Sequence, residues 1–451
     1  MLDRFLFRKI DNAPLIVFRV LFGILISLEC YGAILTGWVK RNLVTPQFTF
    51  SFIGFEWLQP LPGWGMYAYF LVMGTLGVFI ALGYKYRYSI IAFTLMWFSV
   101  YLMQKTAYNN HYYLLVLISG MICFFPAQRA LSIDAKTQPE VRSNHMYALV
   151  KWAIVLQLFI VYTYAALAKL YGDWLDFSFI ELLFKGKKDY PLVGGLLQEP
   201  FLHKIVGIAG IVFDLFIVPA LLWKPSRKLA FIAAIGFHLF NSIIFQIGIF
   251  PYLALAFTVF FFEAQTIRKL FLPKQLPSVI KGYIEVPSYK NAVYGLLIGY
   301  FLIQFLLPVR HYFIKDNVLW TEEGHRMSWR MMLRSRHGNI SYKVINHTTG
   351  NTELVDLDRY LTKSQKNRIG AYPDFIWQFA QRLKNEYAKK EQEISVYVYA
   401  KVSINGKPYQ TIIAPDTDLT KVSWNHFRHN EWILPSVQNG PSGHLIESAE
   451  P

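Results

Sequence analysis

FIVYTYAALAKLYGDW, residues 159–174, is an apolar and aromatic run long enough to enter a bilayer, and it contains one lysine near its end. Taking an ammonium out of water disfavours its charged form, which shifts such a lysine toward a neutral amine that accepts protons. Lys169 is therefore a candidate base embedded in a membrane. The alternative is a lysine whose ammonium reaches interfacial water and marks only the end of a span.

The whole chain has the composition of a polytopic membrane protein. Of its 451 residues, 54% are hydrophobic and only 16% are charged, against about 45–50% apolar and about 25% charged residues in soluble domains. The net charge of +16 is expected for short cytoplasmic loops that face anionic lipid. No zinc-finger, helix-turn-helix or RNA-binding signature indicates a nucleic-acid partner. Cys30 and Cys123 lie in apolar runs without metal or redox spacing, and we expect no disulfide framework and no metal site.

Apolar runs and loop charges together predict about nine membrane spans. Basic turns alternate with the runs, which places the N-terminus inside and the chain after Pro308 outside. The run at 229–262 exceeds the roughly 20 residues of one crossing, and Pro251 divides it because proline breaks a helix. The predicted spans cover residues 14–35, 66–82, 88–102, a run ending near 125, 152–167, 205–223, two segments of 229–262, and 292–307.

The last third of the chain changes to the pattern of a small α+β domain. Residues 340–345 and 394–399 read as strands, and residues 373–387 have helical spacing. Asn405-Gly406 is a tight-turn signal. The fold class is therefore a polytopic α-helical membrane protein followed by a small extracytoplasmic α+β domain. The predicted division is 1–308 for the transmembrane domain, 309–437 for the α+β domain and 438–451 for a flexible tail.

Polar residues gather toward the outer side of the predicted spans, where a binding site is expected because intramembrane polar residues are costly. His238, Asn241, Ser242 and Gln246 share a face at helical spacing, so we expect them to line one cavity. The alternative for these residues is hydrogen bonding that holds helices together. His111 lies between Asn and Tyr residues at a predicted boundary, where it could instead be an interfacial histidine.

Four motifs in one order are more specific than any single motif. They are YNNHYYL at 108–114, the run at 159–174, FHLFNSIIFQIGIFPY at 237–252 and SWRMMLRSR at 328–336, with Asp416 and Trp424 further along. Together they resemble the vitamin K-dependent gamma-carboxylase family from about residue 11 to residue 435. Shorter bacterial relatives of that family share a horizontally transferred transmembrane domain.

The resemblance implies a reaction and a role for each motif residue. The family oxidises vitamin K hydroquinone with O2 to an epoxide, and the strong base so generated removes a γ-hydrogen from a peptide glutamate, whose carbanion adds CO2. Lys169 takes the position of the family lysine that deprotonates the hydroquinone, and His111 that of its active-site histidine. The remaining positions imply a quinone pocket at Asn109, Asn110, His238, Asn241 and Ser242 and a glutamate-binding stretch at Trp329, Arg334 and Arg336, with no metal.

Departures from the family pattern leave alternatives open. Ala168 stands where animal enzymes carry the first of two lysines, their disulfide has no counterpart, and the chain after Pro435 is short, so capture of a propeptide cannot be assumed. We expect a bacterial inner-membrane protein with a cytoplasmic N-terminus and a periplasmic α+β domain, in contact with lipid, a Glu-containing peptide and reduced vitamin K or menaquinol. An endoplasmic-reticulum protein with a lumenal domain would have the same topology. The alternatives are a quinone epoxidase or oxidase without glutamate carboxylation, and a non-catalytic transporter or scaffold.

Overall fold

The computed structural model describes residues 1–273 and 284–436 of the chain. The chain divides into two units, Met1–Phe305 and Leu306–Pro451. Lys274 and Lys281, which belong to a predicted inside turn, lie outside the described residues, as does the predicted flexible tail at 438–451.

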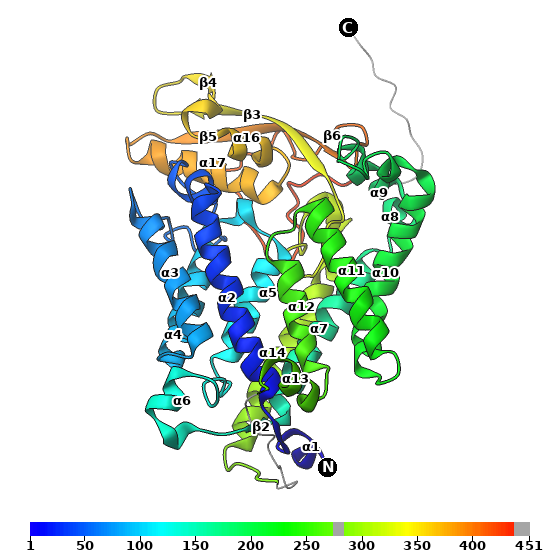
Figure 1. Ribbon diagram of the computed structural model, residues 1–451. Coiled ribbons are helices and arrows are strands. Elements are labelled where there is room, and N and C mark those ends of the chain that lie inside the picture. Colours follow the sequence, from blue (N-terminus) through cyan, green and yellow to red (C-terminus); the bar gives the residue numbers. More distant parts are fainter. Residues whose placement is uncertain (274–283, 437–451) are drawn as a thin grey trace. The chain divides into compact units, whose positions relative to one another are not determined.

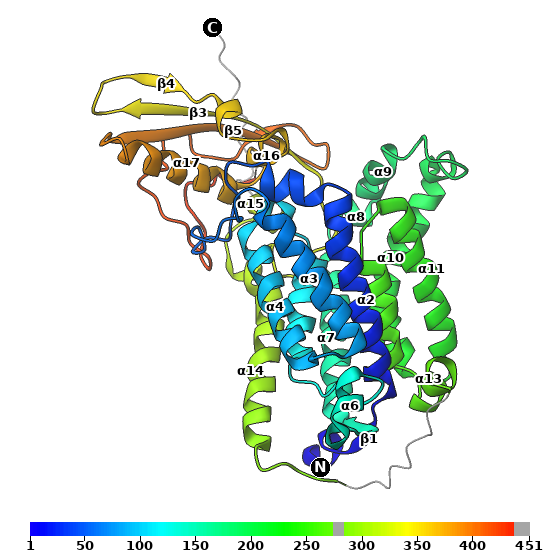
Figure 2. The same ribbon diagram turned by 60° about the vertical axis from the view of Figure 1, so that its left-hand side comes forward.

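The first unit is built from helices (Figure 1), and each predicted apolar run forms one. In Figure 2, α3 stands beside α2, α4 stands beside α3, and α10 stands beside α11. The short helices before and between the long ones are α1 (Leu2–Leu6), α6 (Ile133–Thr137), α8 (Gly172–Leu175), α9 (Ser178–Lys185) and α13 (Ala264–Phe271). The long helices are α2 (Ala13–Leu35), α3 (Gly65–Leu82), α4 (Tyr86–Met103), α5 (Asn110–Ile122), α7 (Ala148–Ala168), α10 (Pro200–Leu222), α11 (Arg227–Phe245), α12 (Phe250–Phe257) and α14 (Lys290–Val309).

The number of candidate spans is smaller than predicted. Among the described residues, six helices are long and apolar enough to cross a membrane: α2, α3, α7, α10, α11 and the helix at Lys290–Phe313. The 13 residues of α5 extend about 20 Å at 1.5 Å per residue, which is less than the roughly 30 Å hydrocarbon core. The helical membrane domain is thus confirmed, whereas nine full spans are not.

Close backbone contact joins α2 to α3. A Cβ atom on Gly23 would lie 2.4 Å from the backbone nitrogen of Ala81, and one on Gly77 would lie 2.5 Å from Ser27 Oγ. Ser27 Oγ donates to the carbonyl of Gly74 at 2.8 Å. Small residues let membrane helices approach in this way, and polar side chains then bond across the contact.

Ion pairs and a two-stranded sheet anchor the N-terminal residues of the first unit. Strands β1 (Lys9–Asp11) and β2 (His145–Tyr147) pair antiparallel. Arg268 on α13 donates to both carboxylate oxygens of Asp11, at 2.7 and 2.8 Å. Lys290 at the start of α14 donates to Asp3 at 2.7 Å. These contacts tie the first residues of the chain to helices far along the sequence.

The second unit is a small α+β fold, as predicted. Its four-stranded antiparallel sheet has the order β4-β3-β5-β6, and Tyr342 of this sheet contacts Phe379 of α17 with ring centroids 5.0 Å apart. The predicted turn at Asn405-Gly406 is confirmed, since both residues have positive φ, 54° and 77°. The elements are α15 (Val318–Thr321), β3 (Arg336–Asn346), β4 (Thr352–Leu354), α16 (Lys363–Ile369), α17 (Pro373–Ala388), β5 (Ile394–Ile404) and β6 (Gln410–Thr411).

Candidate functional site

Lys169 is buried beside an aspartate of another helix. It follows the last residue of α7 and is 6% exposed, and Asp214 on α10 is 5% exposed. The Nζ atom of Lys169 donates to Asp214 Oδ2 at 2.5 Å and to the carbonyl of Ala165 at 3.1 Å. It also lies 5.3 Å from the ring centroid of Trp174. An ammonium that reached interfacial water would be exposed, so this position does not fit a lysine that only marks the end of a span.

Glycines on α10 make room for this pair. Trp174 Nε1 donates to the carbonyl of Gly207 at 3.0 Å. A Cβ atom on Gly210 would lie 3.2 Å from the Trp174 ring and 3.8 Å from Lys169 Cε. The backbone of α10 therefore approaches the indole and the lysine stem directly, and this approach brings Asp214 to the ammonium.

His238 of α11 contacts Tyr162, a residue of α7 on the Lys169 side of that helix. Tyr162 precedes Lys169 by seven residues, which is about two helical turns, so the two share a face. The Tyr162 hydroxyl and His238 Nε2 are 3.1 Å apart. His238 is 2% exposed, and within the described residues its Nδ1 has no hydrogen-bond partner. A buried imidazole nitrogen of this kind is free to bond a ligand oxygen.

Phe250, at the start of α12, connects the two predicted histidines. Its ring centroid lies 5.8 Å from that of His238 and 5.8 Å from that of His111. Phe213, the neighbour of Asp214, stacks on Phe237 with centroids 3.8 Å apart. The cluster of Lys169, Asp214, Tyr162, His238 and His111, with these phenylalanines, is called the inner polar cluster below. It joins residues of α5, α7, α10, α11 and α12.

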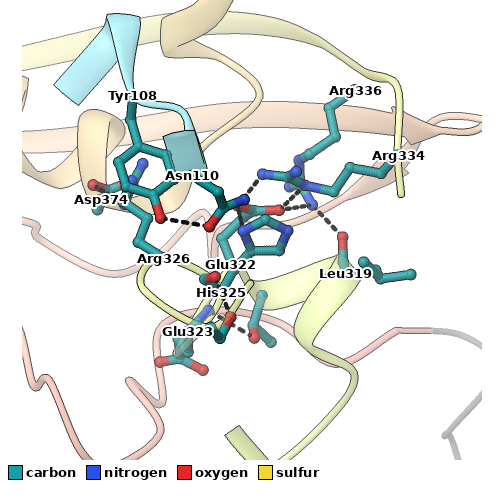
Figure 3. A network of polar contacts seen from close by, with 12 residues as sticks. Tyr108, Asn110, Leu319, Glu322, Glu323, His325, Arg326, Arg334, Arg336 and Asp374 are labelled. Carbon is teal, nitrogen blue, oxygen red and sulfur yellow. Dashed lines mark hydrogen bonds and ion pairs between the residues drawn. The ribbon is translucent and has the colours of Figure 1, made fainter. Parts of the chain in front are cut away.

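The two asparagines before His111 have local structural contacts. The side chain of Asn109 accepts from the backbone nitrogen of Tyr112 at 2.7 Å and so caps the N-terminus of α5. Asn110 accepts from the hydroxyl of Tyr108 at 3.0 Å (Figure 3). An N-cap of this type fixes where a helix begins, and here it sets the position of His111 in the first turn.

The polar face expected on α11 is shorter than predicted. The helix ends at Phe245, and Gln246 takes a left-handed backbone conformation with φ 52°. It is exposed and donates to the hydroxyl of Tyr190 at 2.9 Å, so the prediction that Gln246 shares the face of His238 is wrong. Ser242 bonds the Tyr252 hydroxyl at 3.0 Å, which matches hydrogen bonding between helices, and Asn241 is half-buried one turn beyond His238.

In the second unit, the predicted glutamate-binding arginines already hold a buried carboxylate (Figure 3). Arg334 donates through Nε and Nη2 to the two carboxylate oxygens of Glu322, the second at 2.5 Å. Arg336 Nη1 lies 3.5 Å from the same carboxylate, and its guanidinium also donates to the carbonyls of Ala371 and Trp320 at 2.7 and 2.9 Å. Burial opposes the charge of Arg334, but the attraction of Glu322 outweighs it and raises its pKa.

His325 also lies within this network, 3.9 Å from the Glu322 carboxylate. It is 2% exposed, and its pKa is held well below the ordinary value by burial and by the charges of surrounding arginines, Arg334 first among them. Arg326 is bound to Asp374 at 2.8 and 3.3 Å. Trp329, the third predicted residue, is 1% exposed. The stretch therefore concentrates positive charge in a buried position, compensated by Glu322 and Asp374.

Sequence reasoning missed Asp214, Tyr162 and Glu322. A signal existed for Asp214, because it is the single acidic residue of the apolar run at 205–223, and intramembrane carboxylates are usually functional. Glu29 has the same signature in α2 and accepts from the Tyr112 hydroxyl at 2.8 Å.

In the part of the chain that the structure describes, no group of three or more His, Cys, Asp or Glu residues could hold a metal ion.

The helices and the inner polar cluster define an integral membrane protein with a buried lysine site. Residues 7–265 match the model of the HTTM domain, and residues 289–439 match that of the vitamin K-dependent gamma-carboxylase, lumenal domain. The chain belongs to the vitamin K-dependent gamma-carboxylase family. No solved structure matches it.

Proposed function

We propose that this protein oxidises a reduced naphthoquinone, vitamin K hydroquinone or menaquinol, to its epoxide with O2 and couples the reaction to the addition of CO2 to a peptide glutamate. The observation that carries the proposal is the burial of Lys169 in one cluster with His238 and His111. A transporter would distribute its polar groups along a full transmembrane path, and a lysine facing lipid would be exposed. The gathered, buried arrangement favours a site of chemistry.

The residues of the inner polar cluster fit a quinol. His238 Nδ1 is a buried polar atom without a partner in the described part of the chain, suited to an oxygen of the ring. Phe213, Phe237 and Phe250 supply flat apolar surface around it. When bound, a quinol supplies two electrons and two phenolic protons. Lys169 Nζ would accept one proton, His238 would orient the ring oxygen, and the phenylalanines would exclude water.

For the glutamate step, the proposal uses His111, Trp329, Arg334 and Arg336 in the roles that their family positions imply. Paired guanidinium groups suit a carboxylate substrate. The basic turns between helices support a cytoplasmic N-terminus, with the second unit on the opposite side of the membrane. We place this membrane, as part of the proposal, in a bacterial cell as its inner membrane.

One observation favours the second candidate function, a quinone epoxidase or oxidase without glutamate carboxylation. Glu322 already occupies Arg334 and Arg336. A substrate carboxylate would compete with it for the same donors, and a buried ion pair of this geometry is not easily exchanged.

The test uses purified protein in detergent with reduced vitamin K or menaquinol, O2, labelled bicarbonate and a short Glu-containing peptide. Epoxide and fixed label are measured side by side, with Lys169→Ala as the comparison. Both products in the wild type and neither in the variant are expected. Epoxide without fixed label would establish the second candidate, and neither product from folded protein with either quinol would overturn both.

A further inference from the structure

We infer that Asp214 is a positioning residue that fixes the Lys169 amine and takes over its proton, so that the amine is free to act as a base. This inference rests on the proposed function for the identity of the reaction, but the pairing itself stands on geometry. Nothing in the sequence motifs assigns Asp214 a role.

Two of the three N–H bonds of a Lys169 ammonium have hydrogen-bond acceptors. One points to Asp214 Oδ2 at 2.5 Å and one to the carbonyl of Ala165 at 3.1 Å. The ring of Trp174, 5.3 Å away, faces the amine. An ammonium has no lone pair with which to accept a proton from a substrate. The amine must lose a proton before it can accept one, and Asp214 is the acceptor in contact with it.

The surroundings of the pair permit that transfer. Two opposite charges in an apolar interior are stabilised by each other but are both poorly solvated. Moving the proton across a 2.5 Å contact converts the ion pair to a neutral amine and a neutral acid, which removes the desolvation of both charges. Lys169 and Asp214 are 6% and 5% exposed, so water does little to favour the charged form.

The protons and charges balance. First the proton moves from Lys169 Nζ to Asp214 Oδ2, which breaks an N–H bond and forms an O–H bond. Nζ then takes a proton from a hydroxyl of the bound quinol. The pair now carries two protons and a charge of +1, and the quinol oxygen carries −1, so total charge is unchanged.

Other titratable groups near the pair are few. Tyr162 of α7 and His238 of α11 bond each other at 3.1 Å, and Asp173 of α8 is half-buried four residues after Lys169. Glu181 and Lys185 of α9, which packs against α10, are exposed. Asp214 is the carboxylate that contacts the amine.

The experiment measures quinol oxidation by the full-length protein from pH 6 to pH 9 in wild type, Asp214→Asn, Asp214→Glu and the matched surface neutralisation Glu181→Gln. Because the pair stores its own proton, the wild-type kcat is expected to change less than twofold. Asp214→Asn has no acceptor, so its kcat is expected to fall at least tenfold at pH 7 and to rise about tenfold per pH unit toward alkaline pH, with KM within twofold. Asp214→Glu should restore the flat profile, and Glu181→Gln should match the wild type.

Two results would overturn the inference. One is Asp214→Asn with a wild-type rate at every pH. The other is an equal loss at every pH that Asp214→Glu does not relieve, which would indicate a role in folding alone. Lys169→Met/Asp214→Leu, which removes both charges and leaves an apolar contact, serves as the folding reference because such replacements of buried pairs are tolerated.

A second readout separates this inference from the proposed function. An apolar amine-reactive reagent is applied to the protein without quinol, and modification of Lys169 is followed by mass spectrometry. Only the neutral amine reacts, and Asp214→Asn has no acceptor for the Lys169 proton, so modification at pH 7 is expected to fall at least fivefold below wild type in that variant. Equal modification would refute the pairing, whereas inactivity of the wild type toward quinols, with the fivefold difference intact, would refute only the proposed function.

Discussion

Glu322 should contribute more to the stability of the second unit than any exposed carboxylate of that unit. It is 5% exposed and accepts two hydrogen bonds from Arg334, with Arg336 Nη1 3.5 Å away. Glu322→Ala leaves two buried guanidinium groups without their shared counter-charge. Removing one partner of a buried pair costs about 3–5 kcal/mol. At about 2–4 °C per kcal/mol, this lowers Tm by about 10 °C.

The assay is thermal unfolding of the full-length protein in detergent, followed by tryptophan fluorescence, since Trp320 and Trp329 both lie in the same segment as Glu322. Glu431→Ala is the matched control, because its pair with Lys315 is long at 3.9 Å and exposed on both sides. Exposed pairs contribute roughly 0–1 kcal/mol, so Tm should move by less than about 3 °C. Equal shifts for the two variants would refute the reasoning that burial of the Glu322 network sets its contribution.

Three further predictions follow from particular contacts. Gly23→Leu should abolish folded protein, because its Cβ would lie 2.4 Å from the backbone of α3. Gly32→Leu should fold normally, because no atom lies within 4 Å of its Cβ position. The two variants are compared by the yield of monodisperse protein in detergent. The pKa of His325 is far below its unfolded value of about 6.5. The unfolded state therefore binds one more proton than the folded state, and stability falls as pH drops below about 6.5. Between pH 6.5 and pH 5 the wild type should lose about 2 kcal/mol of stability that His325→Gln does not lose. The Tm of both proteins at the two pH values tests this. Asn109→Ala should lose about 1 kcal/mol through the missing helix cap, and Asn109→Ser should retain it, in the same unfolding assay.

Local patterns predicted the elements well, because each depends on residues close in sequence. Every predicted apolar run forms a helix, and the strand, turn and helix signals of the second unit fall within its observed elements. Among the described residues six helices are long and apolar enough to span a membrane, so nine full spans are not confirmed. Apolar runs do not reveal where helices end: α5 stops at Ile122 after 13 residues. Gln246 shows the same effect. Its left-handed backbone conformation ends α11, so the helical spacing that predicted its position does not extend to it.

The site was less accessible from sequence because its contacts join distant positions. Lys169 was singled out, but its partner lies 45 residues away on another helix. Glu322 likewise meets Arg334 across a loop. Such pairings depend on how elements pack, and in the absence of packing information only the cost of an intramembrane carboxylate pointed to Asp214.

The most direct test of the central claim measures proton acceptance by Lys169 itself. Reduced menaquinone or vitamin K is bound to the protein without oxygen at pH 7, and the absorbance of the ionised quinol is compared in wild type and Lys169→Met, with Lys185→Met as a matched surface control. The account predicts the ionised quinol in wild type and in the control, and only the neutral quinol in Lys169→Met despite equal binding. Ionised quinol in all three, or in none with binding intact, would contradict the assignment of Lys169 as the base.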